Sequence, residues 1–173
     1  MNVKKMGREA TKAGGKPWYE CRMEAAKWDG RLSSREGAAD LLGMSVSALA
    51  DAELELSKCM PPDKAVRMAE LYNAPHLLNY YCLKQCPIGK NKPLSEEILP
   101  IERVTVKLMK GTKLELLDDM KDRLMDIAAD GKISEDELDD LQEITAYLED
   151  VAKTINELKI ITEIAVKRSK RCR

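Results

Sequence analysis

Apolar residues recur every three or four positions along most of the chain, which is the spacing of one face of an α-helix. In the first half this spacing predicts five short helices, separated by Ser, Gly and Pro residues that cap or end helices. They cover approximately residues 18–28, 33–42, 45–52, 61–71 and 76–83. The alternation of apolar and polar residues typical of strands is missing, so the predicted fold class is all-α.

Beyond residue 100 the pattern changes to longer amphipathic stretches. An upstream apolar stripe, interrupted at Gly111, is separated from a downstream one by the turn Ala129-Asp130-Gly131-Lys132. We therefore expect a long antiparallel helical hairpin over residues 101–168. The downstream stripe keeps the seven-residue repeat of a coiled coil. The apolar residues on that repeat are Leu141, Ile144, Leu148, Val151, Ile155 and Leu158.

A hairpin of two helices leaves an apolar side open to solvent. A second copy of the chain can cover it and form a four-helix bundle, so we expect a homodimer through the repeat. Packing of the same side on the N-terminal domain is the alternative.

Composition divides the chain at the same place as the pattern does. All seven prolines lie at or before Pro100. Residues 1–92 hold 15 basic and 11 acidic residues, a net charge of +4, whereas residues 93–173 hold 14 and 19, a net charge of −5. The predicted parts are a flexible basic arm over 1–16, a helical domain over 17–86, a linker over 87–100, the hairpin over 101–168 and a basic tail over 169–173.

The overall composition excludes several classes of protein. With 44% apolar and 34% charged residues, the chain can bury a core and is too apolar for a disordered protein. Its longest uncharged stretch, 71–83, has 13 residues, fewer than the ~18 of a membrane span. No apolar leader segment precedes the first helix, so we expect a cytoplasmic protein that does not enter a membrane.

Nothing in the sequence indicates catalysis. The chain has one histidine and 4% aromatic residues, and it lacks the common catalytic and nucleotide-binding motifs. We therefore expect no enzymatic activity, no cofactor and no small-molecule substrate.

A distinctive motif occupies residues 32–53. Ser33 or Ser34 can cap a short helix that ends at Gly43, whose freedom to adopt a left-handed conformation suits a tight turn. Met44 can plug this turn, and Ser45 can cap the next helix. This pattern resembles the helix-turn-helix of lambda-repressor/Cro-like (Xre-type) regulators, and the resemblance extends over approximately residues 18–83.

The resemblance implies a DNA-binding regulator of transcription whose second motif helix enters the major groove. The residues that match the family's contact positions are Arg35, Ser45, Val46, Ser47, Ala50 and Asp51. The arm adds cations suited to the DNA backbone: Lys4, Lys5, Arg8, Lys12 and Lys16. The expected partners are therefore double-stranded DNA and a second copy of the chain.

The sequence departs from the family pattern within the recognition helix. That helix has no Arg, Lys, Asn or Gln for bidentate base contacts, and Asp51, Glu53 and Glu55 repel phosphate. The alternative function is a protein-interaction adaptor, associated with a phage or another mobile element, that keeps the fold without sequence-specific DNA binding.

Two further strings have the residue types of metal sites. Residues 126–137 match an EF-hand calcium loop at several positions, but Ala128 stands where a ligand oxygen is needed. Cys82 and Cys86 follow His76, but zinc usually needs two such clusters. A capped turn explains the first string and buried thiols explain the second, so no metal is assigned to either.

Overall fold

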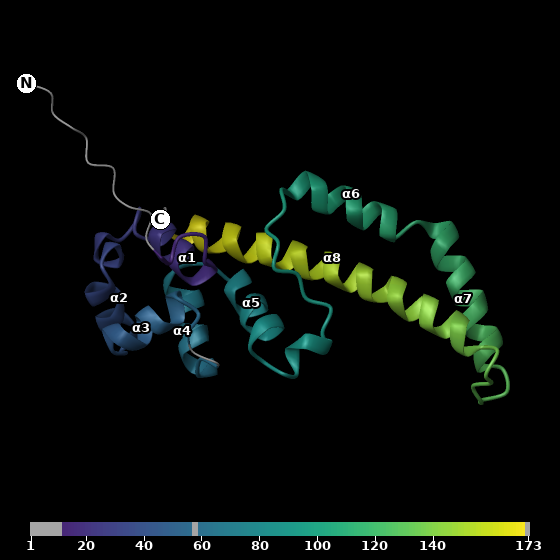
Figure 1. Cartoon of the computed structure of the whole chain (residues 1–173). Helices are drawn as coiled ribbons and strands as arrows, with labels where there is room; N and C mark the ends of the chain where they lie inside the picture. Colours follow the sequence, from purple (N-terminus) through teal and green to yellow (C-terminus); the bar gives the residue numbers. More distant parts are fainter. Residues whose placement is uncertain (1–11, 57–58, 172–173) are drawn as a thin grey trace, which may run out of the picture. The chain divides into compact units, whose positions relative to one another are not determined.

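The computed structural model describes residues 12–56 and 59–171, and Figure 1 shows the order of their helices. All the regular secondary structure within these residues is helical, so the all-α prediction is confirmed for them. The elements are α1 (Pro17–Ala25), η1 (Gly30–Ser33), α2 (Arg35–Leu42), α3 (Val46–Glu53), α4 (Pro62–Leu71), α5 (His76–Lys84), η2 (Gly89–Asn91), α6 (Ile101–Gly111), α7 (Leu114–Ala128) and α8 (Leu138–Arg171), where η marks a 3-10 helix.

The chain forms two compact units, and the boundary between them falls within α5. Unit 1 ends at Leu78, and unit 2 begins at Asn79. The sequence placed this boundary later, in the segment 87–100. Among the helices that the structure describes, none combines the length and the apolar character needed to cross a bilayer.

Within unit 1, the two short helices α2 and α3 each begin after a serine cap. Ser34 Oγ accepts a hydrogen bond from Gly37 N at 3.1 Å, and Ser45 Oγ accepts one from Ala48 N at 3.1 Å. Such caps satisfy backbone donors that have no partner within the helix, which fixes where α2 and α3 begin. The large apolar side chains that are fully buried in this unit are Trp18, Leu32, Leu42, Leu49, Met68 and Leu77.

The part of the expected arm that the structure describes is packed on unit 1. Ala13 is 1% exposed, and Lys16 N donates to Ala13 O at 3.2 Å. Lys16 Nζ also donates to Leu54 O, at the end of α3. Burial of Ala13 and this tie to α3 make residues 12–16 a turn of the domain, so the prediction of an arm that extends to residue 16 is corrected.

In unit 2, both α6 and α7 pack on the long helix α8 (Figure 1). Met120 and Ile127 of α7 form an apolar cluster with Ile144 of α8. Chain direction changes between α6 and α7, where α6 ends at Gly111 and Tyr147 Oη donates to Gly111 O at 2.5 Å. The upstream arm of the expected hairpin is therefore two helices rather than one.

The residues expected at the dimer contact do not all face the same way. Ile144 is only 2% exposed, and Val151 and Leu158 are partly buried. Leu148 and Ile155 are 46% and 41% exposed. Ile144 is a core residue of a single chain, since it packs on α7, and its assignment to a contact between copies is corrected.

The segment expected to be a linker is held in unit 2 by a buried polar network. Asn79 Nδ2 donates to Ser95 O at 2.6 Å and to Asn156 Oδ1 at 2.5 Å. Ser95 Oγ donates to Glu157 Oε1 at 3.0 Å, and Lys107 Nζ lies 2.8 Å from both carboxylate oxygens of Glu157. Ser95 and Glu157 are 2% and 1% exposed, so this part of the predicted linker is fixed to α8.

We expect Glu157→Ala to lower the free energy of unfolding by about 1–3 kcal/mol, because it leaves the buried Ser95 hydroxyl without its acceptor. Urea unfolding followed by circular dichroism measures the change. Glu163→Ala, an exposed position on the same helix, is the control and should change stability by about 0.5 kcal/mol or less. Equal effects of the two substitutions would contradict the role given to Glu157.

Candidate nucleic-acid interface

The most specific local geometry in unit 1 is the tight turn between α2 and α3. Gly43 ends α2 with φ +59°, a left-handed conformation that suits glycine. Met44 N donates to Ala39 O at 3.0 Å, which closes the turn. Ser45 then caps α3, so a three-residue connection joins two helices of eight residues each. The conformation at Gly43 and the cap at Ser45 follow the sequence prediction.

One side of α3 is buried and the other is open to solvent. Leu49 and Ala52 are 0% and 5% exposed and pack in the core of unit 1. The predicted contact residues lie mainly on the other side. Ser45, Val46, Ser47 and Asp51 are exposed, and Ala50 is partly buried. Ser45 Oγ also lies 3.1 Å from Ser47 Oγ, so both hydroxyls stand at the open N-terminal end of the helix.

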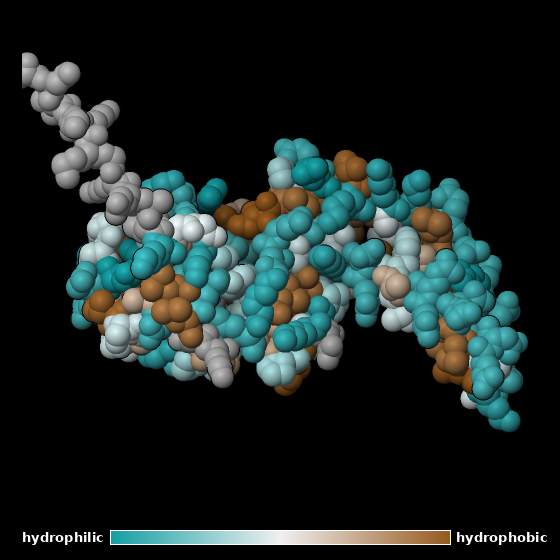
Figure 2. All heavy atoms as spheres, viewed as in Figure 1, coloured by the Kyte–Doolittle hydropathy of each residue, from teal (hydrophilic) through white to brown (hydrophobic). Residues whose placement is uncertain are grey.

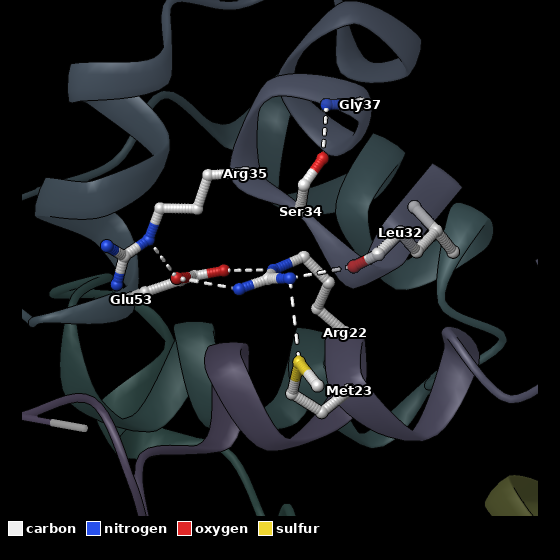
Figure 3. A network of polar contacts seen from close by, with 7 residues as sticks. All are labelled: Arg22, Met23, Leu32, Ser34, Arg35, Gly37 and Glu53. Carbon is white, nitrogen blue, oxygen red and sulfur yellow. Dashed lines mark hydrogen bonds and ion pairs between the residues drawn. The ribbon is translucent and has the colours of Figure 1, made fainter. Parts of the chain in front are cut away.

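The last residue of α3, Glu53, lies in the centre of an ion-pair network (Figure 3). Its side chain is 0% exposed and meets two arginines. Arg22 of α1 donates through Nε to Glu53 Oε1, and through Nη2 to Oε2 at 3.3 Å. Arg35 of α2 donates through Nε to Oε2 at 2.7 Å. Glu53 therefore ties three helices together at one carboxylate.

Arg22 is almost as deeply buried as its partner, with its side chain 3% exposed. Its Nη1 donates to Leu32 O at 2.7 Å, and its guanidinium carbon lies 5.3 Å from the centre of the Tyr19 ring. A buried charge pair is tolerated only where further hydrogen bonds satisfy its remaining donors and acceptors. Here Leu32 O of η1 accepts a hydrogen bond from Arg22, and Arg35 of α2 donates one to Glu53. The pair therefore also fixes how α2 and α3 meet.

Arg35 consequently has a structural role that the sequence did not reveal. The resemblance placed it among the DNA contacts, but its Nε is occupied by Glu53. Its side chain remains 33% exposed, so part of the guanidinium is still accessible at the start of α2.

Two cations near the turn were missed by sequence reasoning. Lys64 Nζ of α4 donates to Gly43 O at 3.0 Å. Arg67 Nη1 lies 3.5 Å from the point where a Cβ on residue 43 would stand. Their spacing of three residues puts both on one side of α4, which the sequence could have shown. That this side meets the turn depends on tertiary packing across more than twenty residues.

The expected cations of the arm divide into two groups. Lys4, Lys5 and Arg8 lie outside the described residues, and no structural statement is made for them. Lys12 is exposed, whereas Lys16 is bound to Leu54 O and lies 3.8 Å from Glu55. Lys16 is therefore committed to the end of α3.

The two metal-like strings have local structural explanations. Glu137 Oε2 accepts hydrogen bonds from Ser134 N at 2.8 Å and from Ser134 Oγ at 2.6 Å, and Gly131 has φ +71°. Cys82 and Cys86 are partly buried, and burial raises the pKa of the Cys82 thiol. Within the described part of the chain, no group of three or more His, Cys, Asp or Glu residues is placed to hold a metal ion.

A second, partly buried polar contact joins α1 to the start of α5 within unit 1. The sulfur of Cys21 lies 3.3 Å from His76 Nε2. Burial raises the pKa of the Cys21 thiol to about 12 and lowers the pKa of His76. Both groups are therefore neutral near pH 7, and the thiol can donate to the imidazole.

Comparison with known proteins adds no candidate to this geometry. No protein-family model, curated protein or solved structure matches the chain. What bears on function is therefore the α2–α3 turn, the open side of α3, and the charges beside them.

We expect Glu53→Ala to lower the free energy of unfolding by about 3–5 kcal/mol, because it leaves the Arg22 charge buried without its partner. Urea unfolding measures the loss. Asp51→Ala removes an exposed carboxylate from the same helix and should change stability by about 0.5 kcal/mol or less. If the two variants were equally stable, the network would not be what fixes α3.

We expect acid to destabilise the protein partly through His76. The pKa of His76 is lowered in the folded state, so the unfolded chain binds a proton more readily. Stability is therefore lost as the pH falls below about 6.5, the pKa of an unperturbed histidine. Urea midpoints of the parent should fall more than those of His76→Gln between about pH 7 and pH 5. Parallel pH profiles would contradict the effect of burial on His76.

Proposed function

We propose that the protein is a DNA-binding regulator of transcription of the lambda-repressor/Cro-like helix-turn-helix type, and that it acts as a dimer. The observation that carries the proposal is the open N-terminal turn of α3, which follows the left-handed Gly43 and is capped by Ser45. A helix presented in this way can insert its first turn into the major groove. The five-helix domain and the C-terminal hairpin expected from the sequence are part of the same proposal.

The exposed side chains of α3 are small enough for close approach to a base pair. The Ser45 and Ser47 hydroxyls can bond to phosphates or base edges, and Val46, 39% exposed, can contact a thymine methyl group. Lys64 and Arg67 supply positive charge beside the turn, where the DNA backbone would pass.

Direct reading of bases by α3 is limited in this proposal. No described residue of α3 carries a positive or amide side chain, and Asp51 is exposed. We infer that recognition relies on few base contacts, together with backbone contacts and the shape of the DNA.

The second candidate function is a protein-interaction adaptor without sequence-specific DNA binding. The exposed carboxylate of Asp51 favours it, because it would lie close to the phosphates of a bound duplex. A regulator and an adaptor differ in whether the isolated chain binds a specific duplex.

We expect the chain to bind DNA from the region upstream of its own coding sequence, with an affinity that falls steeply as salt increases. Val46→Glu should weaken this binding at least about tenfold, since it places a negative charge on the first turn of α3. Gel retardation across a salt series measures both effects.

Val66→Glu is the matched control, because it makes the same substitution at a valine of α4 that is 43% exposed. It should bind as the parent does, and circular dichroism should show that both variants are folded. If the parent does not bind DNA even at low salt, the regulator proposal fails and the adaptor function is favoured. Equal binding by the two variants would exclude α3 as the contact helix.

A further inference from the structure

Unit 2 leaves an apolar surface open on one side of α7 and α8, and Figure 2 shows apolar atoms at the surface over α7. We call it the α7/α8 face and define it by four side chains: Leu117, Leu124, Leu148 and Ile155. They are 37%, 36%, 46% and 41% exposed, in that order. Met125 beside them is 65% exposed. Several exposed apolar side chains on neighbouring helices favour an interaction site in soluble proteins.

The face is hollowed between the two helices. Leu117, Met120, Leu124 and Met125 of α7 and Leu148 of α8 line a groove there. Of these side chains, only Met120 belongs to the core of the unit, where it packs with Ile127 on Ile144. The groove is therefore additional to the contacts that hold α7 on α8.

Both helices carry the spacing of a helix–helix seam on this face. Leu117 and Leu124 are seven residues apart on α7, and Leu148 and Ile155 are seven residues apart on α8. Side chains repeated at seven residues remain in line along a helix that packs against another helix. The occupant that this spacing fits is another α-helix.

The charges of α8 indicate which helix. Its first part, residues 138–150, has five acidic residues and no basic one: Asp139, Asp140, Glu143, Glu149 and Asp150. Its last part, residues 159–171, has five basic residues and one acidic residue, Glu163. The helix is thus negative at one end and positive at the other. A second α8 complements this pattern only when it runs in the opposite direction.

We propose that the α7/α8 face binds a second copy of the chain, with the two α8 helices antiparallel. The proposal deepens the proposed function, because it names the surface and the orientation of the dimer that DNA binding uses. A twofold axis between Val151 and Ala152 places Leu148 of each copy beside Ile155 of the other. The same axis brings the acidic end of each α8 to the basic end of its counterpart, whereas a parallel pair would bring like charges together.

The first test is the mass of the full chain in solution, measured by light scattering without DNA. The parent should have twice the 19.5 kDa of one chain at about 50 µM. Leu148→Asp/Ile155→Asp should be a folded monomer, because both positions are exposed in a single chain and their charges would be buried between copies.

The matched control is Val106→Asp/Met109→Asp. These residues of α6 are 53% and 70% exposed and do not belong to the α7/α8 face. This variant should remain a dimer. A monomeric parent, a dimeric Leu148→Asp/Ile155→Asp variant, or a monomeric control would each overturn the proposal.

The second test is the direction of the helices. A Leu148→Cys chain mixed with an Ile155→Cys chain should form, under mild oxidation, a disulfide between positions 148 and 155, assigned by peptide mass mapping. In a parallel pair, the Leu148→Cys chain on its own would instead form a disulfide between positions 148 of two copies. The Ile155→Cys chain on its own would form one between positions 155. That result would overturn the antiparallel arrangement.

The outcomes separate this inference from the DNA-binding proposal. A monomer that binds its DNA specifically overturns the dimer surface and leaves the regulator function standing. An antiparallel dimer that binds no DNA overturns the regulator function and leaves the dimer surface standing.

Discussion

The arrangement of unit 1 depends on one buried carboxylate. Glu53 accepts hydrogen bonds from Arg22 of α1 and Arg35 of α2, and it is itself the last residue of α3. A charge out of contact with water is stable only when its partners are held in position, so the three helices must meet in one geometry. The core residues favour burial without demanding one geometry, because apolar contacts are not directional. Glu53 supplies the direction, and with it the orientation in which α3 presents Val46 and Ser47 to solvent.

Unit 2 uses a second buried carboxylate in the same way. Glu157 lies in the middle of α8 and binds Lys107 of α6 and the hydroxyl of Ser95. This polar network links α6 and the segment before it directly to α8, so it helps to define where they lie. In both units the hydrophobic pattern produces amphipathic helices, and a glutamate sets the way in which they meet.

Sequence patterns predicted the local features of this fold and missed those that depend on distant pairs. The serine cap at Ser45 and the left-handed Gly43 follow from short-range rules, which operate within a few residues. The role of Arg35 depends on a residue eighteen positions away, and that of Lys64 on one twenty-one positions away. The segment 87–100 has the Pro and Gly content of a linker, but Ser95 is buried because Asn79 and Glu157 have hydrogen-bonding groups that it satisfies. In the candidate site, therefore, the pattern identified the helix that is exposed and could not identify which of the nearby charges are free.

The weak positive charge beside the open side of α3 has a consequence for the proposed assembly. With Arg35 and Lys16 engaged inside unit 1, the described cations beside the α2–α3 turn are Lys64 and Arg67, and Asp51 opposes them. One such domain alone neutralises few phosphates, so the steep salt dependence expected of the DNA complex requires the cations of both domains of a dimer. Two domains joined in one molecule bind two half-sites at once, and the second contact then occurs at a high effective concentration. The charge separation along α8 could join them without using any cation of unit 1. The sparse charge of α3 and the open apolar face of α7 and α8 therefore both fit the proposed dimer, in which specificity would come from the pairing of weak contacts.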